Sequence, residues 1–253
     1  MNTDRPAAIP LLAAGAVTAA LPGIEPIERP PATGFYLDAR PQGLTLQHAE
    51  TVDRDSGLCI DLLDGSIERR LAGGRKSPLA RALGLKRRSR PTVLDTTCGL
   101  GRDSATLAAL GCDVHALERH PVLFALLDDA LMRARRADTP PAWLTHWQAF
   151  EHADAHAWLT PPPPRRFDII YIDPMFAAAR RKARPQKALA WLNELIGTDH
   201  DADALLALAR GHALRQTVVK QHARSQPLAA PDRQVHGKAV RFDIYLAASP
   251  PAG

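Results

Sequence analysis

The chain has 253 residues, a net charge of +5, and 45% hydrophobic and 23% charged residues, which is ordinary for a soluble globular protein. Its length accommodates one large domain, alone or with a small appendage, and its basic balance permits a polyanionic partner. The three cysteines form neither a CxxC pair nor a zinc-type spacing with histidine. The sequence therefore supports no disulfide framework and no metal site.

Residues 1–34 are rich in alanine and proline and weakly patterned, so the sequence assigns them no structure. Their apolar run, bounded by Pro10 and Pro22, lacks a clear basic segment before it and is too short to span a bilayer. We therefore expect a cytoplasmic protein with reduced thiols and no membrane partner.

Residues 35–90 are predicted to form a small β-rich N-terminal region with a linker helix. Short alternating runs stand at 44–46 and 58–63, and Asp64-Gly65 is a turn signal. Residues 77–85 have a helical pattern, and a basic segment at 86–90 leads into the main domain.

Strands and helices alternate through the main domain, residues 91–253. Strands are predicted at 92–96, 113–118, 143–149, 167–172, 214–220 and 240–247, and helices at 102–110, 121–136, 186–196 and 201–210. This alternation predicts a mostly parallel sheet with helices on both faces. No helix precedes the last strand, so we expect it to be antiparallel, at or near an edge.

The segment from Thr92 to Arg119 predicts a nucleotide pocket, because it is a strand–glycine loop–helix–strand unit. Gly99 and Gly101 let the backbone approach a ligand closely. Ser104 stands where a dinucleotide fingerprint has its third glycine. A carboxylate at the helix start, Asp103, repels a pyrophosphate. These features favour S-adenosylmethionine, which carries a sulfonium and an ammonium but no phosphate.

The expected cofactor contacts lie at successive strand ends. We expect Asp95 to meet the methionine ammonium directly or through water, Glu118 to accept both ribose hydroxyls, and Asp154 to accept from the adenine amine. Arg119 would border the adenine, and Arg102 and Asp103 would lie beside the methionine moiety. Singly, these residues also fit structural roles, such as a helix cap for Asp103 or a surface charge for Glu118.

The predicted strand at 167–172 ends in Asp173-Pro174-Met175-Phe176, where amino-group methyltransferases carry a [DN]PP[YF] motif. The Asp173 carboxylate and the Pro174 carbonyl are expected to hold the protons of a base amine and turn its lone pair toward the methyl group. Phe176 is expected to stack on the base. The structural alternative is an Asp-Pro turn followed by a core phenylalanine.

Several segments resemble the ribosomal RNA small subunit methyltransferase J family: LDTTCGLGRDS, GCDVHALERHPVLFALLDDAL, YIDPMF, GTDHDADALLALAR, VVK and RFDIY, with GGRKSPLARALGLK upstream. The resemblance covers residues 57 to 247. It implies a class I, Rossmann-like methyltransferase fold, S-adenosylmethionine as donor, and the N2 amine of a guanosine in 16S rRNA of the small ribosomal subunit as acceptor. By position it also carries cofactor contacts onto Arg102-Asp103, Glu118-Arg119, Asp154-Ala155 and Asp173.

The chain departs from the family after Phe176, where a lysine-rich stretch ending in Glu-Met-Arg is replaced by AAARRKARPQKALAWLNEL. The positive charge remains, and its place beside the catalytic motif favours contacts with RNA phosphates over a solvated charge run. The residues expected to bind RNA are Arg180, Arg181, Lys182, Arg184, Lys187 and Lys220. Two other functions stay open: methylation of another nucleic-acid base amine, in DNA or other RNA, and a non-catalytic RNA-binding assembly factor.

Overall fold

The computed structural model describes residues 9–12, 23–51, 57–86, 89–160, 165–174, 191, 194–195 and 201–247. The chain divides into two compact units. One comprises Met1–Leu62, His120–Pro140 and Ala179–Gly197, and the other comprises Leu63–Arg119, Pro141–Ala178 and Thr198–Gly253. Residues 63–90, which the sequence groups with the N-terminal region, therefore belong with the larger unit.

The smaller unit contains a five-stranded sheet in the order β2-β1-β3-β4-β5. Its strands are β1 (Ile9–Leu12), β2 (Ile24–Ile27), β3 (Phe35–Arg40), β4 (Gly43–His48) and β5 (Leu58–Cys59). Strand β1 runs parallel to β2 and β3, and β3 to β5 form antiparallel pairs. This confirms strands in the predicted β-rich region, and adds two that the sequence does not reveal, because each is four residues long and contains a proline.

Helix α4 (Pro121–Arg136) also belongs to the smaller unit, with the bounds predicted from its sequence. Proline at its first position is favourable, because the missing N–H has no partner there in any helix. In the same unit, Oδ2 of Asp129 accepts from the backbone N–H of Leu44 at 3.0 Å and from Nε of Arg133 at 2.8 Å. The helix is thereby fastened to β4.

The larger unit is built on a seven-stranded sheet in the order β11-β12-β10-β9-β6-β7-β8. Its strands are β6 (Thr92–Asp95), β7 (Asp113–Glu118), β8 (Trp147–His152), β9 (Phe167–Ile172), β10 (Ala213–His222), β11 (Arg233–His236) and β12 (Val240–Leu246). Strands β6 to β10 are parallel, whereas β12 is antiparallel to both β10 and β11. The predicted Rossmann-like sheet and its antiparallel last strand are confirmed.

Some predicted elements of the larger unit are wrong in their bounds or kind. The strand expected at 143–149 begins only at Trp147, because Pro141 starts a 3-10 turn, η3 (Ala142–His146). Residues after Gly65 form helix α1 (Ser66–Arg70) and the 3-10 segment η2 (Leu71–Lys76) rather than continuing a β-rich region. Gly65 is left-handed with φ 72°, and Asp64 accepts from the N–H of Ser66, which starts a helix instead of a hairpin.

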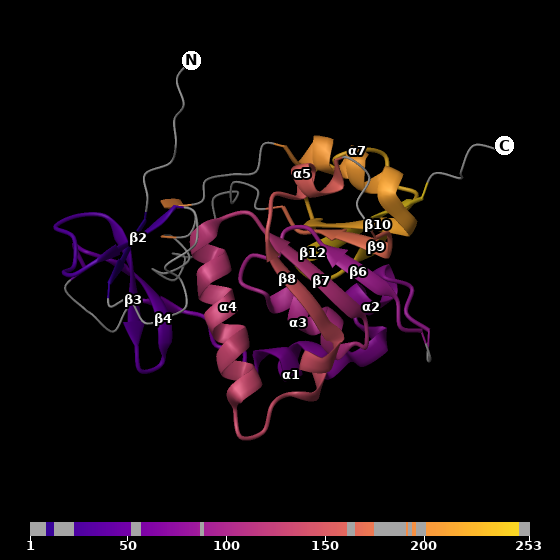
Figure 1. Ribbon diagram of the computed structural model, residues 1–253. Coiled ribbons are helices and arrows are strands. Elements are labelled where there is room, and N and C mark those ends of the chain that lie inside the picture. The colour runs from indigo at the N-terminus through magenta and orange to yellow at the C-terminus, as the bar shows by residue number, and fades with distance from the viewer. Residues whose placement is uncertain are drawn as a thin grey trace, which may run out of the picture. The chain divides into compact units, whose positions relative to one another are not determined.

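Helices cover both faces of the larger sheet (Figure 1). Helices α5 (Ala155–Leu159) and α7 (Ala202–His212) pack with one face, in a core that includes Leu94, Ile170 and Tyr245. The other α-helices in the described part of the unit are α3 (Arg102–Ala109), α1 and α2 (Pro78–Ala82), and α2 is shorter than the helix predicted at 77–85. The helix predicted at 186–196 falls largely outside the described residues.

No helix among the described residues is long and apolar enough to cross a membrane. Within the same residues, no group of His, Cys, Asp or Glu side chains is arranged to hold a metal ion. The three cysteines are free thiols.

Candidate functional site

Four carboxylates stand at the carboxyl ends of four neighbouring parallel strands. Asp95 is the last residue of β6, Glu118 the last of β7, and Asp173 directly follows β9. Asp154 lies two residues beyond the end of β8. Ligands of open α/β sheets bind at the carboxyl ends of the strands, so the topology brings the predicted cofactor and catalytic residues to one place.

Asp95 is held from inside the protein. The Ser104 hydroxyl donates to its Oδ2 at 2.5 Å, and the N–H of Thr97 donates to its Oδ1 at 3.1 Å. The residue is only 1% exposed, and burial raises the pKa of its carboxyl to about 7 despite these two bonds. Asp95 therefore fixes the turn between β6 and α3, and its predicted contact with the methionine ammonium must share the oxygens with that task.

The glycine loop is tied to the end of β7. Gly99 and Gly101 have φ of 57° and 72°, a left-handed conformation that glycine adopts without strain. The N–H of Gly99 donates to Oε2 of Glu118 at 2.7 Å, and the N–H of Cys98 donates to the carbonyl of Leu117 at 3.0 Å. Glu118 is thus a loop anchor as well as the residue predicted to accept the ribose hydroxyls.

Asp103 is the centre of an ion-pair cluster. Its Oδ1 accepts from Nη1 of Arg70, and its Oδ2 accepts from both the Tyr171 hydroxyl and Nζ of Lys220, each at 2.7 Å. Burial alone would raise the pKa of this carboxyl, but Lys220, Tyr171 and Arg70 outweigh it and the pKa lies below its usual value. Asp103 makes no capping bond to α3, so the alternative of a helix cap does not describe it.

Lys220 connects this cluster to the motif that the sequence predicts to be catalytic, since its Nζ also lies 2.7 Å from Oδ2 of Asp173. The N–H of Asp173 donates to Oγ1 of Thr97 at 2.7 Å, which fixes the start of the motif against the glycine loop. Partial burial raises the pKa of Asp173 to about 6, with Asp103 adding to the rise and Lys220 opposing it. The sequence assigns Lys220 to RNA, but its ammonium group lies between two carboxylates.

The residues expected around the adenine form a second, more exposed group. Nη1 of Arg119 pairs with Oδ2 of Asp201 at 2.8 Å and lies 3.8 Å from Oδ2 of Asp154. Oδ1 of Asp154 accepts from two N–H groups in the first turn of α5, so this side chain caps that helix. Asp201 was not anticipated from the sequence, because its pairing depends on residues about eighty positions away.

Several predicted site residues have a simpler placement. Arg102 is exposed at the first position of α3, and Ala155 is buried at the first position of α5. Pro174 is buried beside Asp173. Phe176 and the basic run from 180 to 187 lie outside the described residues.

The chemistry of the strand-end side chains fits S-adenosylmethionine. The side chains at the carboxyl ends of these strands are chiefly carboxylates, which attract a sulfonium and an ammonium and accept hydrogen bonds from hydroxyl and amine groups. The two cationic groups of the cluster, on Arg70 and Lys220, are already paired with Asp103. A phosphate-bearing dinucleotide would meet negative charge here, as the sequence predicts.

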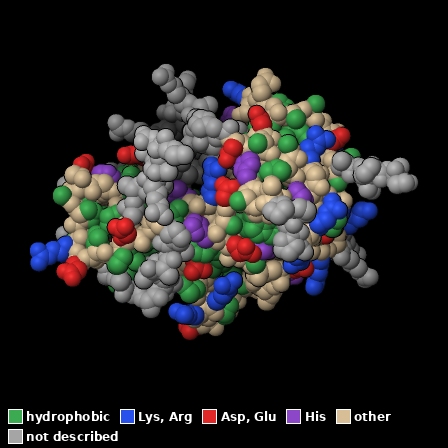
Figure 2. All heavy atoms as spheres, turned by 45° about the horizontal axis from the view of Figure 1, so that its top comes forward, with side chains coloured by type: hydrophobic (Ala, Val, Ile, Leu, Met, Phe, Trp, Pro, Cys, Tyr) green, Lys and Arg blue, Asp and Glu red, His purple; other side chains and the backbone are tan. Residues whose placement is uncertain are grey.

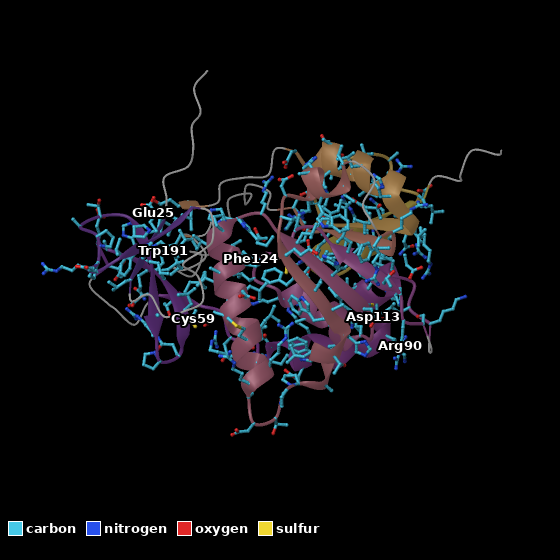
Figure 3. All side chains as sticks on the ribbon, in the orientation of Figure 1. Glu25, Cys59, Arg90, Asp113, Phe124 and Trp191 are labelled. Atoms are coloured by element: carbon cyan, nitrogen blue, oxygen red, sulfur yellow. The ribbon has the colours of Figure 1, made fainter. Side chains whose placement is uncertain are left out.

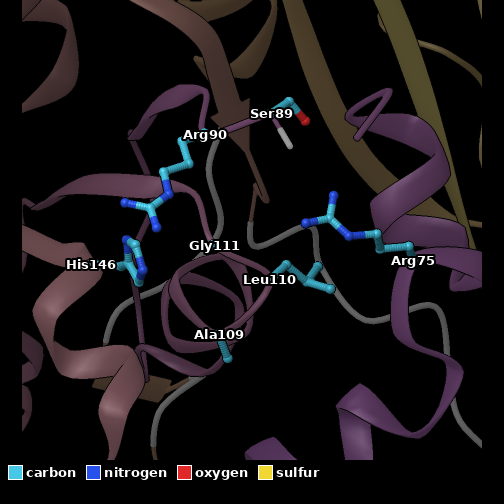
Figure 4. A pocket seen from close by; sticks show the side chains of 7 residues that line it. All are labelled: Arg75, Ser89, Arg90, Ala109, Leu110, Gly111 and His146. Atoms are coloured by element: carbon cyan, nitrogen blue, oxygen red, sulfur yellow. The ribbon is translucent and has the colours of Figure 1, made fainter. Parts of the chain in front are cut away.

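A different cleft lies at the amino ends of the strands, opposite to the carboxylates described above. Arg90 precedes β6 and Asp113 begins β7, so both mark the amino ends of the parallel strands (Figure 3). The cleft has a volume of about 540 Å³ and is lined by Arg75, Arg90 and His146 (Figure 4). Two of these groups have partners, since Arg75 donates to the Lys86 carbonyl and Nδ1 of His146 lies 2.9 Å from Oδ1 of Asp113. This cleft is separate from the carboxylates at the carboxyl ends of the strands.

Comparison with known proteins agrees with this geometry. The chain matches the model of the SAM-dependent methyltransferase family over residues 25–247. A crystal structure of a SAM-dependent methyltransferase from Neisseria gonorrhoeae is 28% identical, with a TM-score of 0.70, and the match covers 95% of this chain and 96% of that one. The fold and the site thus define an S-adenosylmethionine-dependent methyltransferase of class I.

Curated relatives narrow the class further. The ribosomal RNA small subunit methyltransferase J of Photorhabdus laumondii is 41% identical over 213 residues, which is 80% of this chain and 85% of the relative. That of Erwinia tasmaniensis is 39% identical over 218 residues, or 82% and 87%. The chain belongs to the ribosomal RNA small subunit methyltransferase J family.

Proposed function

We propose that the protein transfers a methyl group from S-adenosylmethionine to the exocyclic N2 amine of one guanosine in 16S rRNA of the small ribosomal subunit. The relatives named above are ribosomal RNA small subunit methyltransferases, which supports the class of acceptor. The observation that carries the proposal is the position of Asp173. It directly follows β9, and the neighbouring strand β6 leads into the glycine loop at the same end of the sheet. Action on ribosomal RNA also agrees with the cytoplasmic location that the sequence predicts.

The chemistry requires an acceptor at this position. An exocyclic base amine is a poor nucleophile, because its lone pair is delocalised into the ring. A carboxylate that accepts one amine N–H, together with the Pro174 carbonyl, turns the lone pair out of that conjugation. S-adenosylmethionine, when bound, supplies a methyl carbon activated by its sulfonium. The amine lone pair forms the N–C bond as the C–S bond breaks, and the amine proton leaves through Asp173.

The RNA-binding residues are part of the same proposal. On the face in Figure 2, the acidic, basic and histidine side chains of the described residues are intermixed. We assign the phosphate contacts to the basic run of Arg180, Arg181, Lys182, Arg184 and Lys187, because it follows the motif directly in the sequence. The target guanine must leave its stack, or lie in an accessible region of the RNA, to reach Asp173.

Nucleoside mass spectrometry of 16S rRNA tests the acceptor. A strain that lacks this protein is expected to lose one N2-methylguanosine, which a plasmid with the wild-type chain restores and one with Asp173→Ala does not. Purified Asp173→Ala is expected to keep a wild-type unfolding transition. Loss of a methyl group from another base, or from DNA, would transfer the proposal to that amine, and wild-type turnover by Asp173→Ala would remove Asp173 from the reaction.

A further inference from the structure

Lys220 is placed beside the catalytic motif by strand pairing. Strands β10 and β9 are parallel, with Val219 opposite Ile172, so the next residue of each strand, Lys220 and Asp173, extend the same register. Strand β10 is also paired with β12 on its other side, so the lysine backbone is held in the interior of the sheet. The lysine side chain therefore starts from a rigid position.

The ammonium group of Lys220 holds two carboxylates at once. Nζ lies 2.7 Å from Oδ2 of Asp103 and 2.7 Å from Oδ2 of Asp173, and the lysine side chain is 20% exposed. Both carboxylates are partly shielded from water, so they would repel each other strongly without a cation between them. Two of its three N–H donors are committed to these bonds, which leaves little capacity for a phosphate.

We propose that Lys220 is a positioning residue for methyl transfer, which holds Oδ2 of Asp173 so that Oδ1 faces the target amine as an ionised acceptor. This inference rests on the proposed function of Asp173 and deepens it. Among the described residues, no hydrogen bond to Oδ1 of Asp173 is formed, whereas Oδ2 is engaged by the lysine. The asymmetry divides the carboxylate into an anchored oxygen and a working one.

The charge of Lys220 matters as well as its position. A protonated Asp173 would donate a proton to the amine region instead of accepting one, so catalysis needs the carboxylate. The charged groups around Asp173 are Lys220 on β10, Asp103 on α3, Arg70 on α1 and Asp95 on β6, with the Tyr171 hydroxyl on β9. Removal of the lysine leaves two acids next to Asp173 and one more distant cation, which favours the protonated form near neutral pH.

The test compares Lys220→Met and Lys220→Arg with Lys238→Met, an exposed lysine in the loop before β12 that controls for loss of a lysine. Methyl transfer to 16S rRNA is measured from pH 5 to 9. Lys220→Met is expected to lower kcat at pH 7 by roughly 100-fold, as loss of a positioned acceptor does, with a change in the RNA KM below about threefold. The midpoint of its kcat profile should move up by at least about one pH unit, because the carboxylate then ionises later.

Lys220→Arg keeps the charge and is expected to restore most of the rate and the wild-type midpoint, and Lys238→Met should match the wild type. A Lys220→Met enzyme with an unshifted midpoint and a raised RNA KM would overturn the proposal in favour of an RNA contact. If Lys220→Met does not fold, Lys220→Gln carries the same expectation with a polar side chain. The wild-type product identifies the acceptor separately, so a different methylated base would overturn the proposed function while the pH shift still tests Lys220.

Discussion

The Ser104 hydroxyl donates to Oδ2 of Asp95 at 2.5 Å, and so joins the first turn of α3 to the end of β6. Both residues are buried, with Ser104 0% and Asp95 1% exposed. Ser104 is also the position that separates this loop from a dinucleotide fingerprint. The residue that replaces the third glycine therefore has a structural task, which is to satisfy a buried carboxyl group.

Ser104→Ala is expected to lower the free energy of unfolding by about 1–3 kcal/mol, because one partner of a buried carboxyl is removed. Denaturant unfolding at pH 8, where the carboxyl is mostly ionised, measures the loss. The matched control is Thr145→Ala, whose exposed hydroxyl donates to the Ala142 carbonyl within η3. The control should change stability by less than about 0.5 kcal/mol. Equal effects of the two substitutions would contradict a special role for the Ser104–Asp95 bond.

Asp95 should make the protein less stable as the pH rises toward neutrality. The pKa of its carboxyl is raised from 3.8 to about 7 on folding, chiefly by burial, so the folded state binds the extra proton between these values. Stability from this group is present below the unfolded pKa and is lost as the pH rises to about 7. Between pH 5 and 8 the loss is about 2–3 kcal/mol, since two pKa units of that window count.

The measurement for Asp95 is the difference in unfolding free energy between wild type and Asp95→Asn. The neutral amide cannot titrate, so the unfolding free energy of the variant, relative to that of the wild type, is expected to rise by about 2–3 kcal/mol between pH 5 and pH 8. Other titrating groups are common to both proteins and cancel in the comparison. A difference that stays constant with pH would mean that Asp95 has an ordinary pKa in the folded protein.

Much of the larger sheet is predictable from sequence because buried parallel strands are short, continuous apolar runs. Residues 92–96 and 167–172 stand out in this way. Asp95 is the last residue of β6 and Asp173 directly follows β9, so the topology brings both acids to the carboxyl ends of neighbouring strands. The glycine loop is predictable for a similar reason, since its positive φ angles require glycine at Gly99 and Gly101. Local pattern determines these features, so the sequence reveals them.

The cation between Asp103 and Asp173 is not predictable in this way. Lys220 lies 117 residues from Asp103 in the chain, and nothing near it signals a pairing. Its position at a strand end by the pocket equally fits an RNA contact, which is what the sequence indicates. Only the register of β10 against β9 reveals that its ammonium group meets these two carboxylates, because the register determines which side chains lie side by side. Strand β11 is missed for a different reason, being four mostly polar residues at the sheet edge.

Glu118→Gln is expected to weaken S-adenosylmethionine binding by about 10- to 100-fold, since the charged carboxylate that we expect to accept the two ribose hydroxyls is exchanged for a neutral amide. The amide oxygen can still accept from the N–H of Gly99, so the loop anchor is retained. Isothermal calorimetry measures the affinity, and thermal unfolding reports the fold. Glu68→Gln, on the exposed surface of α1, is the matched control and should bind as the wild type does. Unchanged affinity in Glu118→Gln would restrict Glu118 to anchoring the loop.

Charge reversal in the basic run should separate RNA binding from cofactor binding. Arg181→Glu with Lys182→Glu is expected to weaken 16S rRNA binding by about tenfold or more, and to reduce the slope of log affinity against log salt by about two, because the two proposed phosphate contacts are lost. The affinity for S-adenosylmethionine should stay within about twofold of the wild-type value, because the carboxylates at the strand ends are unaltered. Calorimetry with each ligand, repeated at several salt concentrations for RNA, supplies both readings.

The control for this reversal is Arg135→Glu with Arg136→Glu, which makes the same change in net charge at the exposed last turn of α4. Acidic residues at a helix C-terminus oppose its dipole, so this control is expected to lose stability by about 0.3–1 kcal/mol per residue while keeping most of its RNA affinity. If both double variants weaken RNA binding equally, the affinity depends on net charge alone and the basic run after the motif does not contact RNA specifically. If the first variant loses cofactor affinity instead, the two sites have been exchanged.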